Sequence, residues 1–155
     1  MTPDQPPIKG FVETSSVDWP GQPCAVISLP FCNLRCPYCY SHELVLKANT
    51  LETIPLDKIL NRLSPQRDRV GGICITGGEP TIHRNLPVLL ETIRGAGFQT
   101  KLDTNGTQPE ILAYYIEVAC NGFFGVSLEA DIGDQTGLLR QAEIAVFDPE
   151  ANDLY

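Results

Sequence analysis

Three cysteines lie close together in the stretch FCNLRCPYCYSHE. Cys32, Cys36 and Cys39 follow the spacing C-x3-C-x2-C, so that half of the chain's six cysteines fall within eight residues. Packing alone rarely produces such clustering, whereas thiolates at close spacing are typical ligands of zinc and of iron–sulfur clusters. The stretch therefore predicts a metal centre.

Two kinds of metal centre remain open. Zinc takes four ligands, and His42, at C-x2-H spacing after Cys39, would complete a Cys3His site that only braces the loop. A [4Fe–4S] cluster held by three cysteines would instead leave one iron open to an outside ligand, and an open position is what makes a metal reactive. Cys24, Cys74 and Cys120 lie in apolar runs, and we interpret them as small core residues.

Two further loops carry residues that could meet a ligand. In GGEP, Gly77 and Gly78 lack a Cβ atom, so their backbone could approach a ligand closely, and Glu79 could add negative charge. We expect a valine at Gly78 to weaken ligand binding by crowding this backbone approach and to leave the metal cluster in place. Asp103 and Thr104 end another apolar run, directly before an Asn-Gly turn signal. For both loops the alternative is a plain tight turn.

The elements that position these loops follow an alternating pattern. The predicted strands are 24–29, 72–76, 98–104, 123–130 and 142–147, and the predicted helices are 56–63, 85–97 and 108–122. Apolar strands that alternate with helices predict an α/β fold, as a partial parallel (β/α) barrel or a curved open parallel sheet of about five to six strands. Sites in such folds lie at the C-terminal strand ends, so we expect the three loops to converge there.

Length and composition indicate a single soluble domain over residues 1–155. The chain is 43% hydrophobic and 19% charged. Residues 1–9 are predicted to form a loose tail, and the C-terminal part is either minimal or truncated. A net charge of −8 disfavours nucleic acid as a partner. We find no signal peptide and no apolar run long enough for a membrane span, so we expect a cytoplasmic protein.

Taken together, these motifs resemble those of the radical S-adenosylmethionine (radical SAM) superfamily. The cysteine triplet with an aromatic residue before its last cysteine, and GGEP about forty residues later, are similar to the two motifs of that superfamily. The wider stretches GFVETSSVDWPGQPCAVISLPFCNLRCPYCY, ITGGEPTIH and LDTNG resemble activating enzymes of glycyl radical enzymes. The similarity is greatest to anaerobic ribonucleoside-triphosphate reductase activating proteins, and it runs from about Gly10 to Leu128.

This resemblance implies a function. Cys32, Cys36 and Cys39 would be the catalytic metal ligands of a [4Fe–4S] cluster, whose open iron is chelated by S-adenosylmethionine. The reduced cluster would give one electron to the sulfonium, and the resulting 5′-deoxyadenosyl radical would remove a hydrogen atom from its target. The implied partners are a glycyl radical enzyme, above all anaerobic ribonucleoside-triphosphate reductase, and an electron donor such as flavodoxin or ferredoxin.

The resemblance also assigns residues around the cofactor, with the GGEP loop on the methionine moiety. Tyr38 would pack near the adenine, or alternatively plug the loop against the core. Asp103 and Thr104 match positions that bind a monovalent cation in some relatives. Relatives commonly carry a D-x-K pattern after the fourth strand; here Glu129 keeps a carboxylate as a cofactor-binding candidate, but Asp131 stands where lysine is usual.

Two other functions stay open. One is a radical SAM enzyme that acts on a small molecule, such as a deazapurine precursor. The other is a non-catalytic iron–sulfur or zinc-binding module. His42 and His83 receive no catalytic role and are expected to be surface polar residues, because hydrogen-atom abstraction needs no general base.

Overall fold

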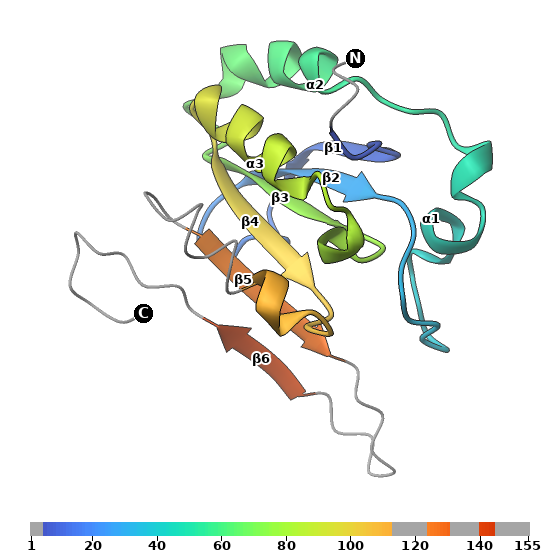
Figure 1. The fold of residues 1–155 in the computed structure, drawn as a ribbon. Helices are drawn as coiled ribbons and strands as arrows, with labels where there is room; N and C mark the ends of the chain where they lie inside the picture. Colours follow the sequence, from blue (N-terminus) through green and yellow to red (C-terminus); the bar gives the residue numbers. More distant parts are fainter. Residues whose placement is uncertain (1–4, 113–123, 131–139, 145–155) are drawn as a thin grey trace.

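The computed structural model describes residues 5–112, 124–130 and 140–144, which form a twisted six-stranded sheet with helices (Figure 1). The strands, which lie side by side in chain order, are β1 (Gly10–Ser15), β2 (Cys24–Leu29), β3 (Gly72–Gly77), β4 (Gln99–Thr104), β5 (Phe124–Ala130) and β6 (Arg140–Ile144). β2 to β5 pair in parallel, whereas β1 and β6 pair antiparallel at the two edges.

Three helices lie between β2 and β4 in the chain. They are α1 (His42–Leu46), α2 (Leu56–Leu63) and α3 (Leu86–Gly95), with short 3-10 turns at Ala48–Thr50, Ser64–Gln66 and Pro80–Ile82. α2 and α3 cover one face of the sheet, and α1 lies beyond the end of β2 (Figure 1). The backbone is also helical at 109–112. Within the part of the chain that the structure describes, no helix has the length and apolar character to cross a membrane.

The main core lies between this helix layer and the sheet. Its buried side chains recur every three or four residues in α2 and α3, as expected of helices with one apolar face. They pack on alternate residues of β2, β3 and β4, such as Ile27, Ile75 and Leu102, which have no exposed surface. Burial of each such side chain stabilises the fold by about 1.5–3 kcal/mol.

The predicted fold class is confirmed in part. The central four strands are parallel and follow the predicted runs closely, but the expectation of a wholly parallel sheet is wrong at both edges. β1 was not predicted, because its alternating pattern is short and largely polar. The predicted strand at 142–147 is antiparallel and begins at Arg140, and residues 145–147 lie outside the described residues. So does most of the helix predicted at 108–122.

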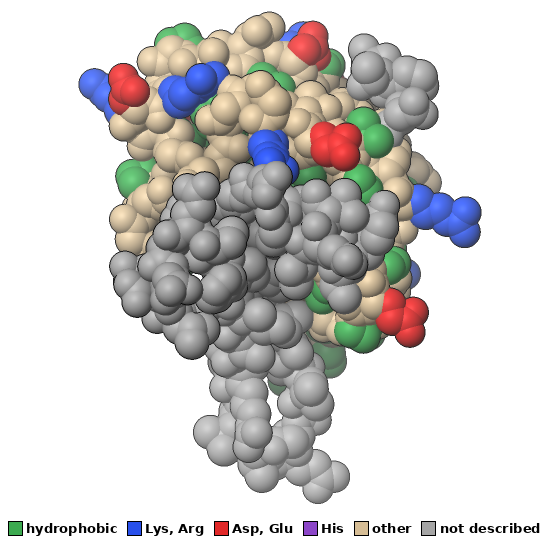
Figure 2. All heavy atoms as spheres, turned by 60° about the vertical axis from the view of Figure 1, so that its left-hand side comes forward, with side chains coloured by type: hydrophobic (Ala, Val, Ile, Leu, Met, Phe, Trp, Pro, Cys, Tyr) green, Lys and Arg blue, Asp and Glu red, His purple; other side chains and the backbone are tan. Residues whose placement is uncertain are grey.

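On the face drawn in Figure 2, the described charged side chains are of both signs. Residues 5–112 carry ten Lys and Arg and ten Asp and Glu, so they contribute no net charge. The net charge of −8 comes from Asp4 and from residues 113–155, which hold eight acidic residues against Arg140 alone. The part of the chain that carries the cysteine loop is therefore electrically balanced.

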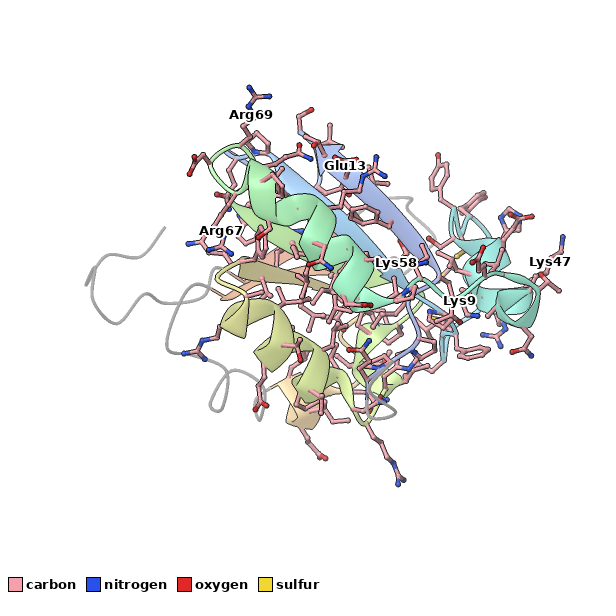
Figure 3. The ribbon with its side chains drawn as sticks, turned by 90° about the horizontal axis from the view of Figure 1, so that it is seen from above. Lys9, Glu13, Lys47, Lys58, Arg67 and Arg69 are labelled. Carbon is pink, nitrogen blue, oxygen red and sulfur yellow. The ribbon has the colours of Figure 1, made fainter. Side chains whose placement is uncertain are left out.

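The N-terminal segment is packed rather than loose from residue 6 onward. Ile8 is buried in the main core, and its carbonyl accepts a hydrogen bond of 2.8 Å from Ile54 N. Lys9, labelled in Figure 3, donates from Nζ to Leu51 O and to Thr53 Oγ1 at 2.7 and 2.9 Å. The prediction of a loose tail over residues 1–9 is therefore wrong for this part, because an apolar residue there completes the core.

The opposite face of the sheet carries a small second cluster. Cys24, Val26 and Cys74 are buried there, and Trp19 packs against them from the segment that joins β1 to β2. The ring of Trp19 lies so close to Gly72 that a Cβ atom there would be 2.6 Å from it. The interpretation of Cys24 and Cys74 as core residues is confirmed, whereas Cys120 lies outside the described residues.

Candidate functional site

The three loops singled out in the sequence meet at one edge of the sheet. The cysteine loop follows β2, GGEP follows β3 and DTNG ends β4, and these three strands are parallel neighbours (Figure 1). The first two loops are joined by backbone hydrogen bonds: Gly78 N donates to Leu29 O and Glu79 N donates to Phe31 O, both at 2.8 Å. The predicted convergence of the loops is confirmed.

The two glycines of GGEP serve this contact between loops. Gly77 has φ +114°, a conformation that favours glycine, and a Cβ atom there would lie 2.4 Å from Leu29 O. A Cβ atom at Gly78 would lie only 1.7 Å from Phe31 O. A valine side chain at Gly78 would therefore displace the residue next to Cys32, which argues against the expectation that the cluster stays in place; cluster retention itself stays a prediction.

Glu79 is a fully buried carboxylate that ties the GGEP loop to the DTNG loop. Its Oε1 atom accepts hydrogen bonds from the backbone N of Thr81 at 2.9 Å, from the Thr81 hydroxyl, and from the Thr104 hydroxyl at 2.7 Å. Its Oε2 atom accepts from the backbone N of Asn105 at 2.6 Å. These contacts make it a structural link between the loops, and its predicted contact with a cofactor stays a prediction.

The cysteine loop has an anchored base and an exposed tip. Its base is held by His83 from the turn after β3, whose Nε2 atom lies 2.8 Å from Pro30 O and therefore donates its proton to that carbonyl. Burial lowers the pKa of His83, with the Pro30 carbonyl and Glu79 acting in the opposite direction. The expectation of a surface role is wrong for this half-buried residue but confirmed for His42, which is exposed.

The three predicted ligands lie in this loop and are all partly exposed, in contrast to the fully buried Cys24 and Cys74. Among the described residues, no three His, Cys, Asp or Glu side chains are gathered as in a metal site. Three accessible thiols on one loop fit the donor set of a [4Fe–4S] cluster.

Tyr38 also lies at the exposed tip. It is 83% exposed, so the alternative that it plugs the loop against the core is wrong, and its predicted packing on adenine stays a prediction. Tyr40 is fully exposed, and Phe31 and Leu34 are more than one third exposed. The tip therefore presents several large apolar side chains beside the three cysteines.

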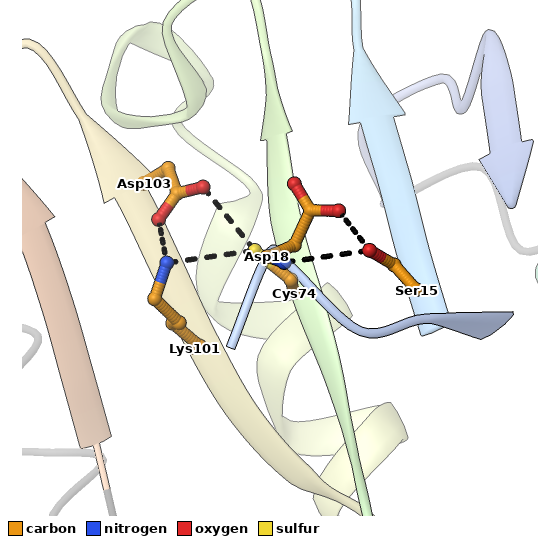
Figure 4. Close-up of polar contacts among 5 residues, drawn as sticks. All are labelled: Ser15, Asp18, Cys74, Lys101 and Asp103. Atoms are coloured by element: carbon orange, nitrogen blue, oxygen red, sulfur yellow. Dashed lines mark hydrogen bonds and ion pairs between the residues drawn. The ribbon is translucent and has the colours of Figure 1, made fainter. Parts of the chain in front are cut away.

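A second group of polar residues lies on the face of the sheet opposite α2 and α3 (Figure 4). The ammonium of Lys101 forms a mostly buried ion pair with Asp103, and Cys74 Sγ donates to Asp103 Oδ2 at 3.2 Å. Burial acts to lower the pKa of Lys101, but the hydrogen bond to Asp103 and the charges of Cys74, Asp103 and Asp18 raise it overall. Asp18 itself accepts a hydrogen bond from Ser15.

Asp103 and Thr104, the predicted cation-binding residues, contact different side chains in the structure. Asp103 already contacts a positive charge, the Lys101 ammonium, whereas the Thr104 hydroxyl is buried against Glu79. A monovalent cation at these residues stays a prediction. Glu129 lies near the C-terminal end of β5, where its backbone pairs with Gln141, and Asp131 lies outside the described residues.

Comparison with known proteins agrees with this arrangement. The family model described as "Radical SAM superfamily" matches residues 26–139. The chain is 35% identical over 113 residues, 71% of its length, to a Methanocaldococcus jannaschii protein named "Putative glycyl-radical enzyme activating enzyme", of which the match covers 45%. It is 34% identical over 105 residues, 65% of its length, to 7-carboxy-7-deazaguanine synthase of Aquifex aeolicus, of which the match covers 46%.

A third relative is named for a different reaction from the first two. The chain is 32% identical over 110 residues to GTP 3',8-cyclase of Bradyrhizobium diazoefficiens, a match that covers 66% of this chain and 31% of that protein. The chain thus spans less than half the length of these curated relatives. The chain belongs to the radical SAM superfamily, a membership that implies a [4Fe–4S] cluster and S-adenosylmethionine as cofactors.

Replacement of Gly78 by alanine tests the contact between the loops. The added methyl group would collide with the Phe31 carbonyl, so we expect Gly78→Ala to lower the free energy of unfolding by about 1–3 kcal/mol and to reduce the iron bound after anaerobic reconstitution. Gly95→Ala is the matched control, because a Cβ atom at that helical position meets nothing within 4 Å. Urea unfolding and iron analysis measure both effects. Equal behaviour of the two variants would contradict the contact.

Replacement of Glu79 by glutamine tests the buried link. An amide NH2 group in place of one carboxylate oxygen would face backbone or hydroxyl donors, so we expect Glu79→Gln to cost about 1–3 kcal/mol of stability. Glu91→Gln, at an exposed position of α3, should change stability by less than about 0.5 kcal/mol. Urea unfolding at neutral pH compares the two. A loss for Glu79→Gln no larger than that of its control would show that the carboxylate does not hold the loops.

Proposed function

We propose that this radical SAM protein is an activating enzyme that generates a glycyl radical on a partner enzyme. The first candidate partner is an anaerobic ribonucleotide reductase, and a flavodoxin- or ferredoxin-type protein is the candidate electron donor. Cys32, Cys36 and Cys39 are the proposed ligands of the [4Fe–4S] cluster. Supporting this, the archaeal relative named above carries the activating activity in its name, and the motifs of this chain fall on one edge of the sheet.

The chemistry depends on a group that the loop has to hold and orient. The loop cysteines would hold the cluster, which would supply the electron for reductive cleavage of S-adenosylmethionine and so allow hydrogen-atom abstraction from the target. The residues of this chain provide the geometry. Gly78 and His83 fix the base of the cysteine loop, Glu79 holds the adjoining loop, and the tip leaves the cysteines partly exposed.

The observation that carries the proposal is the apolar tip of the cysteine loop. Tyr38 and Tyr40 are almost wholly exposed, and Leu34 joins them within the same loop. Exposed clusters of aromatic and aliphatic side chains are typical of surfaces that contact another protein. A radical generated beside this tip would be accessible to a loop of a large partner, and a glycine offers a Cα atom that no side chain shields.

A second candidate function is radical chemistry on a small molecule of the deazapurine type. It is favoured by several relatives named 7-carboxy-7-deazaguanine synthase, including a Neisseria meningitidis protein that is 39% identical over 89 residues. Such a reaction would need the cofactor and substrate to be enclosed together. The exposed loop tip favours the protein substrate over this alternative, and a direct assay separates the two.

The cofactor assignment predicts a specific metal content. Anaerobically reconstituted protein should contain about four iron and four sulfide per chain, and with dithionite it should cleave S-adenosylmethionine to methionine and 5′-deoxyadenosine. Replacement of Cys32, Cys36 or Cys39 by alanine should abolish this cleavage. Cys24→Ala should retain the cleavage activity, because Cys24 lies in the small hydrophobic cluster on the opposite face of the sheet. Stoichiometric zinc in place of iron would exclude radical chemistry.

The target is tested by isotope transfer. A candidate partner is prepared with deuterium at the Cα atoms of its glycines and mixed with this protein, S-adenosylmethionine and reductant. We expect one deuterium in 5′-deoxyadenosine and a glycyl radical signal in electron paramagnetic resonance. A parallel reaction contains a deazapurine precursor labelled at its reacting carbon. Transfer of label from that molecule, and none from glycine, would favour the alternative function.

A further inference from the structure

One side chain outside the predicted ligand set reaches a predicted ligand. Asn105, in the DTNG loop, places its Nδ2 atom 3.7 Å from Cys32 Sγ, within hydrogen-bonding reach for sulfur. The backbone N of Leu34 lies 3.3 Å from the same sulfur. The Cys32 thiol can also donate to Asn33 Oδ1, which lies 3.9 Å from its Sγ atom. This contact is lost when a metal binds, because a thiolate has no proton to donate. The two N–H contacts are thus the ones that suit the thiolate form of Cys32.

The orientation of the Asn105 amide is fixed by its neighbours. Its Oδ1 atom accepts from the backbone N of Thr107 at 3.1 Å and from the Thr107 hydroxyl at 2.7 Å. A backbone N–H can only donate, so the atom that faces it has to be the amide oxygen. The NH2 group consequently points toward Cys32 and Asn33.

A closed ring of hydrogen bonds holds the amide in place. Asn105 Nδ2 donates to Asn33 Oδ1 at 2.9 Å, Asn33 Nδ2 donates to Thr107 Oγ1 at 2.7 Å, and the Thr107 hydroxyl donates back to Asn105 Oδ1. One N–H of Asn105 is used in the ring and the second is left for the sulfur. The backbone N of Asn105 is anchored separately on the buried carboxylate of Glu79.

From this geometry we infer that Asn105 is a positioning residue that raises the reduction potential of the cluster through its hydrogen bond to Cys32. An N–H donor stabilises the extra negative charge of the reduced state more than the oxidised state, and hydrogen bonds to the sulfurs are one of the factors that set cluster potentials. The one-electron reduction by the external donor is thereby made easier. The inference rests on the proposed assignment of Cys32 as a cluster ligand.

The test measures potential rather than turnover. Wild-type protein, Asn105→Ala and Asn61→Ala are reconstituted anaerobically with iron and sulfide, and each is titrated with dithionite while electron paramagnetic resonance follows the reduced cluster. Alanine at 105 keeps the backbone N–H to Glu79 and removes only the amide. Asn61→Ala is the matched control, because Asn61 is exposed on α2. We expect a more negative midpoint potential for Asn105→Ala alone, at unchanged iron and sulfide content.

A second variant keeps the inference testable if Asn105→Ala does not retain a cluster. Thr107→Val leaves Asn105 in place but removes the hydroxyl that holds its amide, so its potential should shift in the same direction by less. An unchanged potential in loaded Asn105→Ala, or failure of both variants to bind a cluster that Asn61→Ala binds, would overturn the inference. A wild-type protein without a cluster would instead refute the proposed function.

Discussion

The buried carboxylate of Glu79 is the interaction on which the arrangement of the site depends. A carboxylate with no exposed surface is costly unless it is hydrogen-bonded, and here donors from two different loops converge on it. Loss of any donor would leave charge unsatisfied, so the two loops are fixed relative to each other. Because Asn105 is one of these donors and its side chain also reaches Cys32, the link extends from the interior of the fold to a predicted metal ligand.

Gly78 adds a second constraint of a different kind. Its contact with Phe31 is backbone against backbone, so it cannot relax by a change of side-chain rotamer. Together with the hydrogen bond between His83 and Pro30, it fixes the point where the chain leaves β2. Beyond that point the loop is partly to fully exposed, and Asn33 ties it to the DTNG loop. A fixed base with an accessible tip suits a loop that carries the three proposed cluster ligands.

The features that could be predicted from the sequence are those that a short segment determines by itself. The cysteine triplet, the apolar runs of β2 to β5 and the loops that follow them were all recognisable, because spacing and periodicity are properties of short segments. The sequence did not predict that Gly78 contacts Phe31 or that Glu79 binds the backbone of Asn105, because these pairings arise only when β3 lies between β2 and β4. Ile8 was missed for a similar reason, since a single apolar residue in a proline-rich segment has no period.

Burial separates the cysteines of the loop from the two core cysteines of the described chain. Burial raises the pKa of Cys74, and the negative charge of Asp103 beside it acts in the same direction. Burial and Asp18 likewise raise the pKa of Cys24. Both shifts disfavour the thiolate, which is the form that binds a metal. The partly exposed loop therefore offers the more accessible thiols to an incoming group. With its three cysteines as the proposed ligands, one iron of a [4Fe–4S] cluster would be left open for S-adenosylmethionine.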